Sequence, residues 1–312
     1  MKRYVLGSET IKGCAEIVLY AEDGVQWQVE EEASDKLICK AFKAEDIFKN
    51  IYSGNYVRPV IPEGYKYVAG AWNEGFTIER EADGSQFVWV PVGSLPANGT
   101  LDGINFIEKF GRRNFQRQMF SDAKFHEHMT PALAAQMESV KNYGGFYVSA
   151  FNISMGNDGK IHAVKGAMPM TNISCEAAKQ LAETFETGKT LKSHLLYGAE
   201  YDSILEWLIA SKAHNRREIT SDSSRLGNFA NSENQLEKTG SNENWKMNNI
   251  YDLAGNVNEW TMEQFGKASC DRIVRGGGYC HSGTAFPVAY RGGERKNSFY
   301  PYTGFRVALE IK

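Results

Sequence analysis

The chain has 312 residues, of which 42% are hydrophobic and 23% charged, and its formal net charge is −3. That composition predicts a soluble globular protein with one large or two ordinary domains. Both signs of charge are interspersed and there is no long run of Lys or Arg, which argues against nucleic acid as a partner.

The first residues, MKRYVLGSETIKG, have no apolar core of the kind that a signal peptide carries, and no apolar run approaches the length of a membrane span. We therefore expect synthesis in the cytoplasm and no insertion into a membrane. The five cysteines are scattered without CxxC spacing, which argues against a disulfide framework or a zinc site. Cys270 and Cys280 could meet across a hairpin, but buried free thiols are the commoner outcome.

Residues 1–58 are interpreted as a small β-rich module for assembly or attachment. Two short apolar runs, 16–20 and 25–29, flank the turn signal Glu-Asp-Gly and predict a hairpin. Residues 44–51 predict a short helix with three apolar residues on one side.

A proline-rich connector at 58–64 marks the start of the larger domain, residues 59–312. Residues 76–80 and 86–91 flank a turn and predict a second hairpin. Val88 and Val90 would lie on one face of its second strand, with Trp89 on the other.

Two helices are predicted from their caps: one starts after Thr130 and ends at Gly144, and the other starts after Ser174 and ends at Gly188. A strand is expected at 145–151, between them. A third helix, 199–212, carries an apolar stripe from which Trp207 is excluded. Residues 214–249 are mostly polar, and a covering loop held by Phe229 and Trp245 is favoured over a catalytic lid.

The last sixty residues contain three firm segments. Residues 252–260 are rich in turn formers, 272–278 predict a short buried strand that opens into three glycines, and 304–309 predict an alternating strand. Between the last two lies the 279–303 block, in which six of 25 residues are aromatic, against 12% of the whole chain. Tyrosine mixed with Ser, Gly and Asn is typical of recognition loops. A Tyr- and Gly-rich β rim without a ligand is an equally open interpretation.

The candidate ligand-binding residues are the rings and polar groups of this block. They are Tyr279, His281, Ser282, Thr284, Phe286, Gly292, Glu294, Arg295, Asn297, Phe299, Tyr300 and Tyr302.

The order DLAGNVNEW, RIVRGGGY, YR and GFRVAL resembles the formylglycine-generating-enzyme type of C-type lectin fold. The resemblance implies an α+β, C-type lectin-like domain behind the small β-rich N-terminal module. Within that superfamily the chain is most similar to the variable proteins of diversity-generating retroelements, which are common in phages and prophages. In those proteins adenine-directed mutagenesis rewrites a C-terminal lectin-fold surface, and the 279–303 block resembles such a variable region.

The enzymes of this superfamily hold copper with a pair of cysteines in the segment that corresponds to 284–291, and this segment has no cysteine. Cys280 is the only thiol nearby. The histidines are dispersed, and the pair His126 and His128 is poorly placed for a shared metal. No catalytic triad or phosphate-binding motif is recognisable. We therefore expect a non-enzymatic protein with no redox cofactor.

A structural calcium ion is the more credible chemistry that the resemblance implies. Its ligands would be the side chains of Asp252 and Glu259 and the carbonyls of Gly255 and Val257. The alternative is that Asp252 caps a turn and Glu259 pairs with an arginine such as Arg275 or Arg306.

Together these observations predict a non-enzymatic ligand-binding protein with a diversified lectin-fold surface. The expected partner is a protein or a glycan on a cell surface. The expected setting is receptor recognition by a phage or prophage, in which the protein would be associated with the virion, or cell adhesion. The alternatives are an oxidase of the formylglycine-generating type and an invariant structural subunit of a phage tail. The identity of the ligand and the oligomeric state stay open.

Overall fold

The computed structural model describes the backbone of residues 2–6, 17–21, 25–33 and 36–43, and then residues 59–71, 74–92, 110, 127–230, 235–265 and 271–312. The chain divides into two compact units, Met1–Gly54 and Asn55–Lys312.

The N-terminal unit contains two antiparallel strand pairs. β1 Lys2–Leu6 pairs with β2 Ile17–Ala21, and β3 Val25–Ala33 pairs with β4 Lys36–Lys43. The predicted strands at the Glu-Asp-Gly turn therefore exist, but the hairpin is wrong, because each strand pairs with its other neighbour in the chain. The predicted helix at 44–51 lies outside the described residues.

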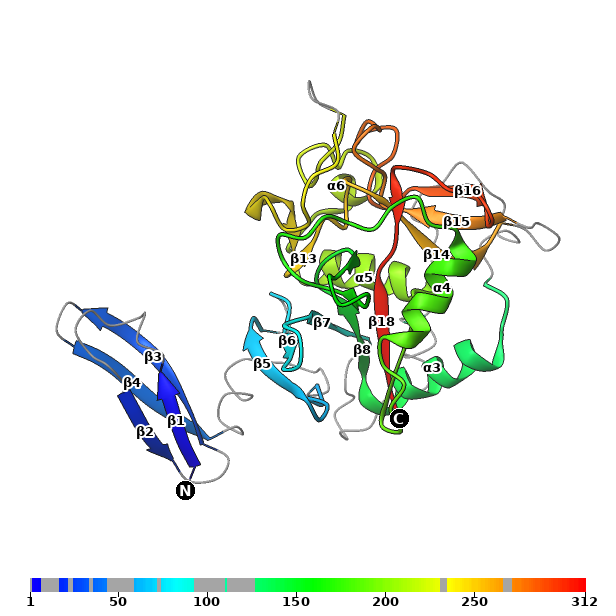
Figure 1. Cartoon of the computed structure of the whole chain (residues 1–312). Coiled ribbons are helices and arrows are strands. Elements are labelled where there is room, and N and C mark those ends of the chain that lie inside the picture. Colours follow the sequence, from blue (N-terminus) through cyan, green and yellow to red (C-terminus); the bar gives the residue numbers. More distant parts are fainter. Residues whose placement is uncertain are drawn as a thin grey trace. The chain divides into compact units, whose positions relative to one another are not determined.

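The larger unit is built on a six-stranded sheet, in which every neighbouring pair of strands is antiparallel. In order across the sheet, the strands are β11 Leu191–Leu195, β18 Val307–Ile311, β8 Gly145–Ser149, β7 Gln86–Pro91, β6 Thr77–Arg80 and β5 Tyr65–Ala69. Figure 1 shows β18, in red, running beside β8. The hairpin of β6 and β7 and the strands β8 and β18 are confirmed, whereas β5 and β11 were not predicted.

Helices cover the two faces of this sheet. On one face, Val88 belongs to the apolar cluster that also contains residues of α5 Gly198–Ala210. On the other, the ring of Phe87 packs edge-on against Phe185, which caps α4 Cys175–Thr184, with 5.2 Å between the ring centroids. The central strands β7 and β8 are therefore buried on both sides, and they provide a rigid base for the rest of the unit.

The first predicted helix is confirmed at both ends. α3 Pro131–Tyr143 starts after Thr130, whose hydroxyl accepts a hydrogen bond from the backbone N–H of Leu133 at 3.1 Å. Gly144 follows it with φ of 76° and donates its N–H to the carbonyl of Val140. A residue with a Cβ adopts this left-handed conformation at a cost, which explains the glycine.

The second helix, α4, also starts where it was predicted, because the Ser174 hydroxyl accepts a hydrogen bond from the N–H of Ala177 at 3.2 Å. It ends at Thr184, with Phe185 as its C-terminal cap, and not at Gly188. Helix ends depend on the chain that follows, and here Phe185 turns into the core against the sheet.

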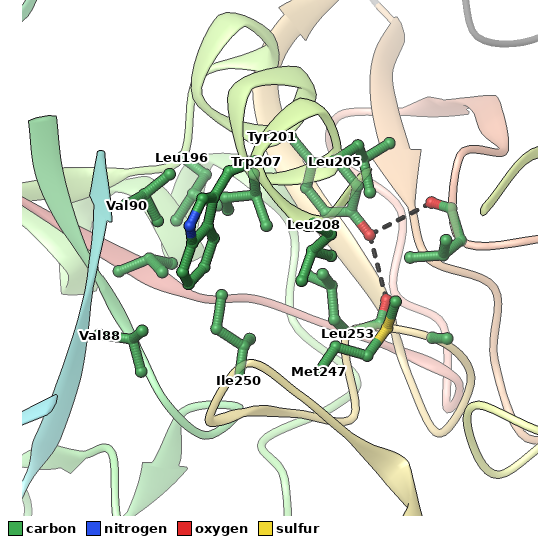
Figure 2. Close-up of a cluster of buried hydrophobic side chains, with 14 of the residues drawn as sticks. Val88, Val90, Leu196, Tyr201, Leu205, Trp207, Leu208, Met247, Ile250 and Leu253 are labelled. Carbon is green, nitrogen blue, oxygen red and sulfur yellow. Dashed lines mark hydrogen bonds between the residues drawn. The ribbon is translucent and has the colours of Figure 1, made fainter. Parts of the chain in front are cut away.

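Helix α5 confirms the third prediction but not the position of Trp207. Ten of its thirteen residues are buried, so the helix has no exposed polar face. Trp207 lies in the core cluster with Val88 and Val90 of β7 (Figure 2) and is 3% exposed. The apolar stripe predicted from the sequence left out Trp207 because a single stripe assumes that the opposite side of the helix faces water. In the structure, protein covers that side as well.

A second, four-stranded sheet contains the C-terminal motifs. Its strands in order are β16 Arg291–Arg295, β15 Asp271–Arg275, β14 Asn258–Gln264 and β17 Thr303–Gly304. β14 and β17 run parallel, and the other pairs are antiparallel. β15 confirms the predicted buried strand. β16 was not predicted, and it lies inside the 279–303 block.

Short elements complete the unit. They are β9 Ser154–Met155, β10 Ile161–His162, α6 Arg216–Thr220, a 3-10 turn at Glu243–Trp245, β12 Lys246–Met247 and β13 Ile250–Tyr251. In the polar segment 214–249, Phe229 is buried as predicted, but Trp245 is only half-buried. Met247 takes the inner position and is fully buried in the core cluster.

Candidate functional site

The three glycines after β15 lead the chain into the 279–303 block by a close passage. Gly276 and Gly277 have φ of +88° and +77°. A Cβ at Gly276 would lie 2.7 Å from the carbonyl oxygen of Leu253, and one at Gly277 would lie 2.7 Å from that of Phe286. Both positions therefore require glycine, and the bend predicted from the sequence is confirmed.

The backbone of the block is held by hydrogen bonds from three other parts of the chain. They join it to the loop before α4, to the segment around α6, and to the turn before β14. The bonds, donor first, are Asn172 N to Tyr300 O (2.9 Å), Cys175 N to Lys296 O (2.9 Å), Ser223 N to Gly283 O (3.0 Å), Ala230 N to His281 O (2.7 Å), Ala289 N to Ile219 O (3.1 Å), Tyr279 N to Asn256 O (2.8 Å) and Asn258 N to Tyr302 O (2.7 Å). Main-chain atoms from outside the block therefore fix much of its path.

A few apolar side chains of the block also point inward. Val288 and Ala289 are buried, and Val288 belongs to the main core cluster. The hydroxyl of Tyr201 on α5 lies 3.1 Å from the carbonyl of Leu253 and 3.4 Å from that of Val288, as the dashed lines in Figure 2 show. Helix α5 thus connects the block to the centre of the unit.

Eleven of the twelve predicted binding residues are exposed or half-buried. These are Tyr279, His281, Ser282, Thr284, Phe286, Glu294, Arg295, Asn297, Phe299, Tyr300 and Tyr302. Phe299 is 64% exposed, more than any other large hydrophobic side chain in the described part of the chain. Gly292 is the exception, because it is buried in β16 opposite Val274 and a Cβ there would lie 2.7 Å from the ring of Tyr290.

The rings of the block form one continuous row. Its contacts, given as distances between ring centroids, are Tyr290 to Phe286 (4.4 Å), Phe286 to His281 (4.2 Å), His281 to Tyr302 (5.3 Å), Tyr302 to Tyr300 (5.4 Å) and Tyr300 to Trp260 (6.4 Å). Only Trp260 is fully buried. We call the other five rings the aromatic row. It offers partly exposed ring faces and edges that start from a buried tryptophan.

Glu294 is the acidic group of this row. It is half-buried, and its nearest polar partner is the Thr303 hydroxyl, which lies 3.4 Å from Glu294 Oε2. Burial raises the pKa of Glu294 to about 7. The Glu294 carboxylate in turn contributes to the raised pKa values of Tyr290, Tyr302 and Cys280, so these groups lie close to it.

A layer of buried ion pairs lies beneath the block. Arg275 donates to Asp202 on α5 at 2.8 Å, and its guanidinium lies 4.4 Å from the centroid of the Tyr201 ring. Arg291 of β16 pairs with Glu263 of β14. All four charged groups are buried. These pairs tie β14, β15, β16 and α5 together and so support the strand from which Glu294 projects.

The two predicted calcium carboxylates have protein partners. Arg306 Nε donates to Glu259 Oε1 at 2.5 Å, and the side-chain amide of Asn152 donates to the same oxygen at 2.9 Å. The Thr239 hydroxyl donates to Asp252 Oδ2 at 2.8 Å. Burial raises the pKa of Glu259 to about 7, although Arg306 opposes that shift. These are the contacts of the alternative interpretation, with Arg306 and not Arg275 as the arginine.

The residues nevertheless fit a cation in one respect. Asp252 Oδ1 and Glu259 Oε2 are buried oxygens without a hydrogen-bond partner among the described residues. Gly255, with φ of 73°, and the buried Val257 lie on the turn between them. Within the described part of the chain no three His, Cys, Asp or Glu side chains gather as a metal site. Backbone carbonyls would have to complete a calcium shell, and calcium binding stays a prediction.

The thiol nearest the block is that of Cys280, which is half-buried. Burial is the main cause that raises its pKa, so the thiol form dominates at neutral pH. Cys175 is the other free cysteine among the described residues, and it is buried under α4. Cys270 and His126 lie outside the described residues.

Sequence reasoning missed a separate cavity of about 440 Å³ that lies between the β6–β7 turn and α4. The His162 ring forms its polar wall, with Nδ1 at 2.8 Å from Asp83 and Nε2 at 2.9 Å from Asp158. Arg80 also pairs with Asp83 and stacks on Phe185. These charged groups satisfy one another, and no predicted site residue lines the cavity.

The sheets, the helices and the long irregular segments between them define an α+β domain of the C-type lectin-like class. Residues 105–311, more than half of the chain, match the family model described as Sulfatase-modifying factor enzyme 1-like domain, and the chain belongs to this family. The family includes enzymes as well as non-enzymatic relatives.

Three of the solved structures that are similar to this chain are CarF, variable protein 1 of Treponema denticola and PvdO from Pseudomonas aeruginosa. CarF shares 15% identity over 54% of this chain and 87% of its own, with a TM-score of 0.39. Variable protein 1 of Treponema denticola shares 14% over 72% and 95%, with a TM-score of 0.42. PvdO from Pseudomonas aeruginosa shares 15% over 54% and 82%, with a TM-score of 0.39. No curated protein matches the sequence significantly. Among the described residues, no helix is both long enough and apolar enough to cross a bilayer.

Proposed function

We propose that the chain is a non-enzymatic ligand-binding protein that displays a diversified lectin-fold surface, in the manner of the variable proteins of diversity-generating retroelements. Residues 279–303 form the variable surface. The ligand is a protein or a glycan on a cell surface, and the setting is receptor recognition by a phage or prophage, or adhesion.

The observation that supports this proposal is that the contacts that fix the backbone of the block are largely separate from the side chains that it exposes. Main-chain hydrogen bonds from outside the block and the buried residues Val288, Ala289 and Arg291 hold its path. The exposed side chains add only local bonds, such as the one from the N–H of Ala285 to the Ser282 hydroxyl at 3.2 Å. A surface can be rewritten without loss of the fold only if its side chains are separate from the contacts that fix its backbone.

The experiment that tests the proposal is sequencing of this gene from many isolates, together with its neighbouring DNA. We expect a reverse transcriptase gene and an adenine-rich near-copy of the 3′ end. Substitutions should concentrate at the exposed positions of the block and avoid the inward-facing Val288, Ala289, Arg291 and Gly292. A block as invariant as the six-stranded sheet, with no near-copy beside the gene, would instead favour an invariant structural subunit.

The oxidase alternative is tested separately with purified protein, copper, oxygen and a cysteine-containing peptide of the sulfatase type. We expect no conversion of the peptide cysteine, because the segment 284–291 has no cysteine pair to hold copper. Turnover that is lost in a Cys280→Ser variant would contradict the non-enzymatic proposal.

A further inference from the structure

We propose that the aromatic row recognises a basic side chain, arginine or lysine, on the surface of a protein target, with Glu294 as its counterion. This rests on the proposed function, because it assigns ligand chemistry to the same surface. It also chooses between the two partner classes, in favour of a protein.

The first argument is charge. In the layer beneath, the carboxylates of Asp202, Glu259 and Glu263 each face an arginine. Glu294 has no ion pair within 4 Å among the residues that the structure describes, although Arg272 is its partner in the β15–β16 register. The buried charges of this sheet are therefore compensated from within the protein, and the carboxylate at its surface is left for a cation from outside.

The second argument is the position of Glu294 among rings. Glu294 lies two residues after Gly292 on β16 and so projects from the same face, where the ring of Tyr290 lies 2.7 Å from the position of a Cβ at Gly292. The hydroxyl of Thr303, the residue after Tyr302, lies 3.4 Å from the Glu294 carboxylate, and both tyrosines are half-buried members of the aromatic row. The face of an aromatic ring carries a negative quadrupole that attracts ammonium and guanidinium groups. A ring face beside an uncompensated carboxylate therefore offers two favourable contacts to one cation. The flat guanidinium of arginine can stack on the ring and donate to the carboxylate at the same time.

The third argument separates a protein from a glycan. A neutral sugar also stacks on aromatic rings, but it leaves the half-buried carboxylate of Glu294 without a positive partner. Arginine is enriched in the centres of protein interfaces, where it pairs with aromatic side chains of the partner. A protein surface with an exposed basic residue complements the row in both shape and charge.

The experiment uses the full chain labelled with 3-fluorotyrosine and two synthetic peptides, acetyl-Gly-Arg-Gly-amide and the same peptide with citrulline in place of arginine. Citrulline has nearly the shape of arginine but no charge. Fluorine NMR titrations follow the signals of Tyr290 and Tyr302, assigned with the Tyr290→Phe and Tyr302→Phe variants. A third titration uses methyl galactoside as the neutral sugar probe.

We expect the arginine peptide to shift both signals and the citrulline peptide to bind at least about tenfold more weakly, as for loss of a charged hydrogen-bond partner. Glu294→Gln should weaken the arginine peptide by a similar factor. Glu138→Gln, which removes an exposed carboxylate on α3 at the other end of the unit in Figure 1, should leave it unchanged. Melting curves of both variants verify that they fold.

Equal affinity for the two peptides, no shift with the arginine peptide, or unchanged affinity in Glu294→Gln would overturn the proposal. Stronger shifts of the same signals with methyl galactoside would overturn it in favour of a glycan. None of these results touches the pattern of substitutions among isolates, so a failure here is distinguishable from a failure of the proposed function.

Discussion

The buried layer and the surface layer of the C-terminal region differ in whether their carboxylates form ion pairs with arginines. In the buried layer, Arg306 meets Glu259 and Arg275 meets Asp202, and every one of these groups is inaccessible to water. In the surface layer, burial raises the pKa of Glu294 to about 7, as it does for Glu259, but Glu294 forms no ion pair among the described residues, although Arg272 lies opposite it on β15.

The raised pKa therefore arises in two different structural settings at Glu259 and Glu294. For Glu259, burial is the cost of a carboxylate that accepts hydrogen bonds from Arg306 and Asn152 and so orients two strands and a loop. For Glu294, burial raises the pKa and only the hydrogen bond from the Thr303 hydroxyl opposes that shift. The comparison indicates that an uncompensated half-buried charge, more than a perturbed pKa, distinguishes a binding group from a structural one.

The largest expected effect separates the two layers by stability. Phe305→Ala should lower the free energy of unfolding by roughly 3–5 kcal/mol, because Phe305 is fully buried and its removal leaves a cavity. Phe299→Ala, at a side chain that is 64% exposed, should change it by no more than about 0.5 kcal/mol. Urea unfolding of the two variants measures both. Similar losses in the two would mean that the surface rings belong to the core, and the interpretation as a rim without a ligand should then be taken.

The next effect tests the unpartnered oxygens of the buried layer. If Asp252 and Glu259 hold calcium, a concentration about 100 times Kd should stabilise the fold by about 2.7 kcal/mol. Thermal unfolding with calcium and with a chelator measures it, and Asp252→Asn should reduce the difference. An unchanged melting temperature with chelator would leave Asp252 as a turn cap and Glu259 as the partner of Arg306.

A smaller effect concerns binding by the aromatic row. Tyr302→Ala should weaken binding to cells that the intact protein recognises by about 1–2 kcal/mol, because a ring at an interface supplies contact area. The same experiment with Tyr279, Phe286, Phe299 and Tyr300 ranks the rings as anchors. Met129→Ala is the matched control, since Met129 is also exposed but lies before α3, outside the block. Equal weakening by the control would mean that the row is not the contact surface.

The smallest effect is a pH dependence that Glu294 should add to stability. Burial raises the pKa of Glu294 in the folded state to about 7, above its ordinary value of 4.5, so the folded state binds the proton more tightly. The stabilisation by protonation is present at low pH and is lost as pH rises through 7. The melting temperature of Glu294→Gln relative to wild type should therefore be higher at pH 8 than at pH 6.

The other titratable groups around Glu294 should not mask the pH dependence between pH 6 and pH 8. Burial and the nearby carboxylate raise the pKa values of Tyr290, Tyr302 and Cys280 above their ordinary values of 9.0 or more, and burial lowers that of His281 below its ordinary 6.5. A difference between variant and wild type that does not change with pH would contradict the assignment of the shift to Glu294.

The parts of the fold that the sequence predicted are those with local causes. The caps Thr130 and Ser174 and the glycines after β15 act on atoms a few residues away, and each was placed correctly. The buried strand predicted at 272–278 was also placed correctly, because its apolar residues Ile273 and Val274 are buried in β15.

The missed parts have distant causes. β16 reads Arg-Gly-Gly-Glu-Arg, with no apolar pattern, and becomes a strand because β15 pairs with it and Glu263 holds Arg291. Trp207 was misplaced because residues from β7 cover the second side of its helix. In the candidate site, exposure of the rings followed from composition, but the lack of an ion pair to Glu294 among the described residues depends on the side-chain positions and could not be predicted from the sequence.

The position of β18 has a consequence for how changes in the block are screened. This strand follows the block in the sequence, yet it lies between β8 and β11 inside the six-stranded sheet. A stop codon or a frameshift anywhere in residues 279–303 deletes it, leaving the edges of β8 and β11 unpaired and their apolar faces uncovered. Such a product cannot complete its domain and is a substrate for proteases. Only copies read in frame through the whole block yield a complete domain. Defective versions are therefore degraded before any of them meets a target.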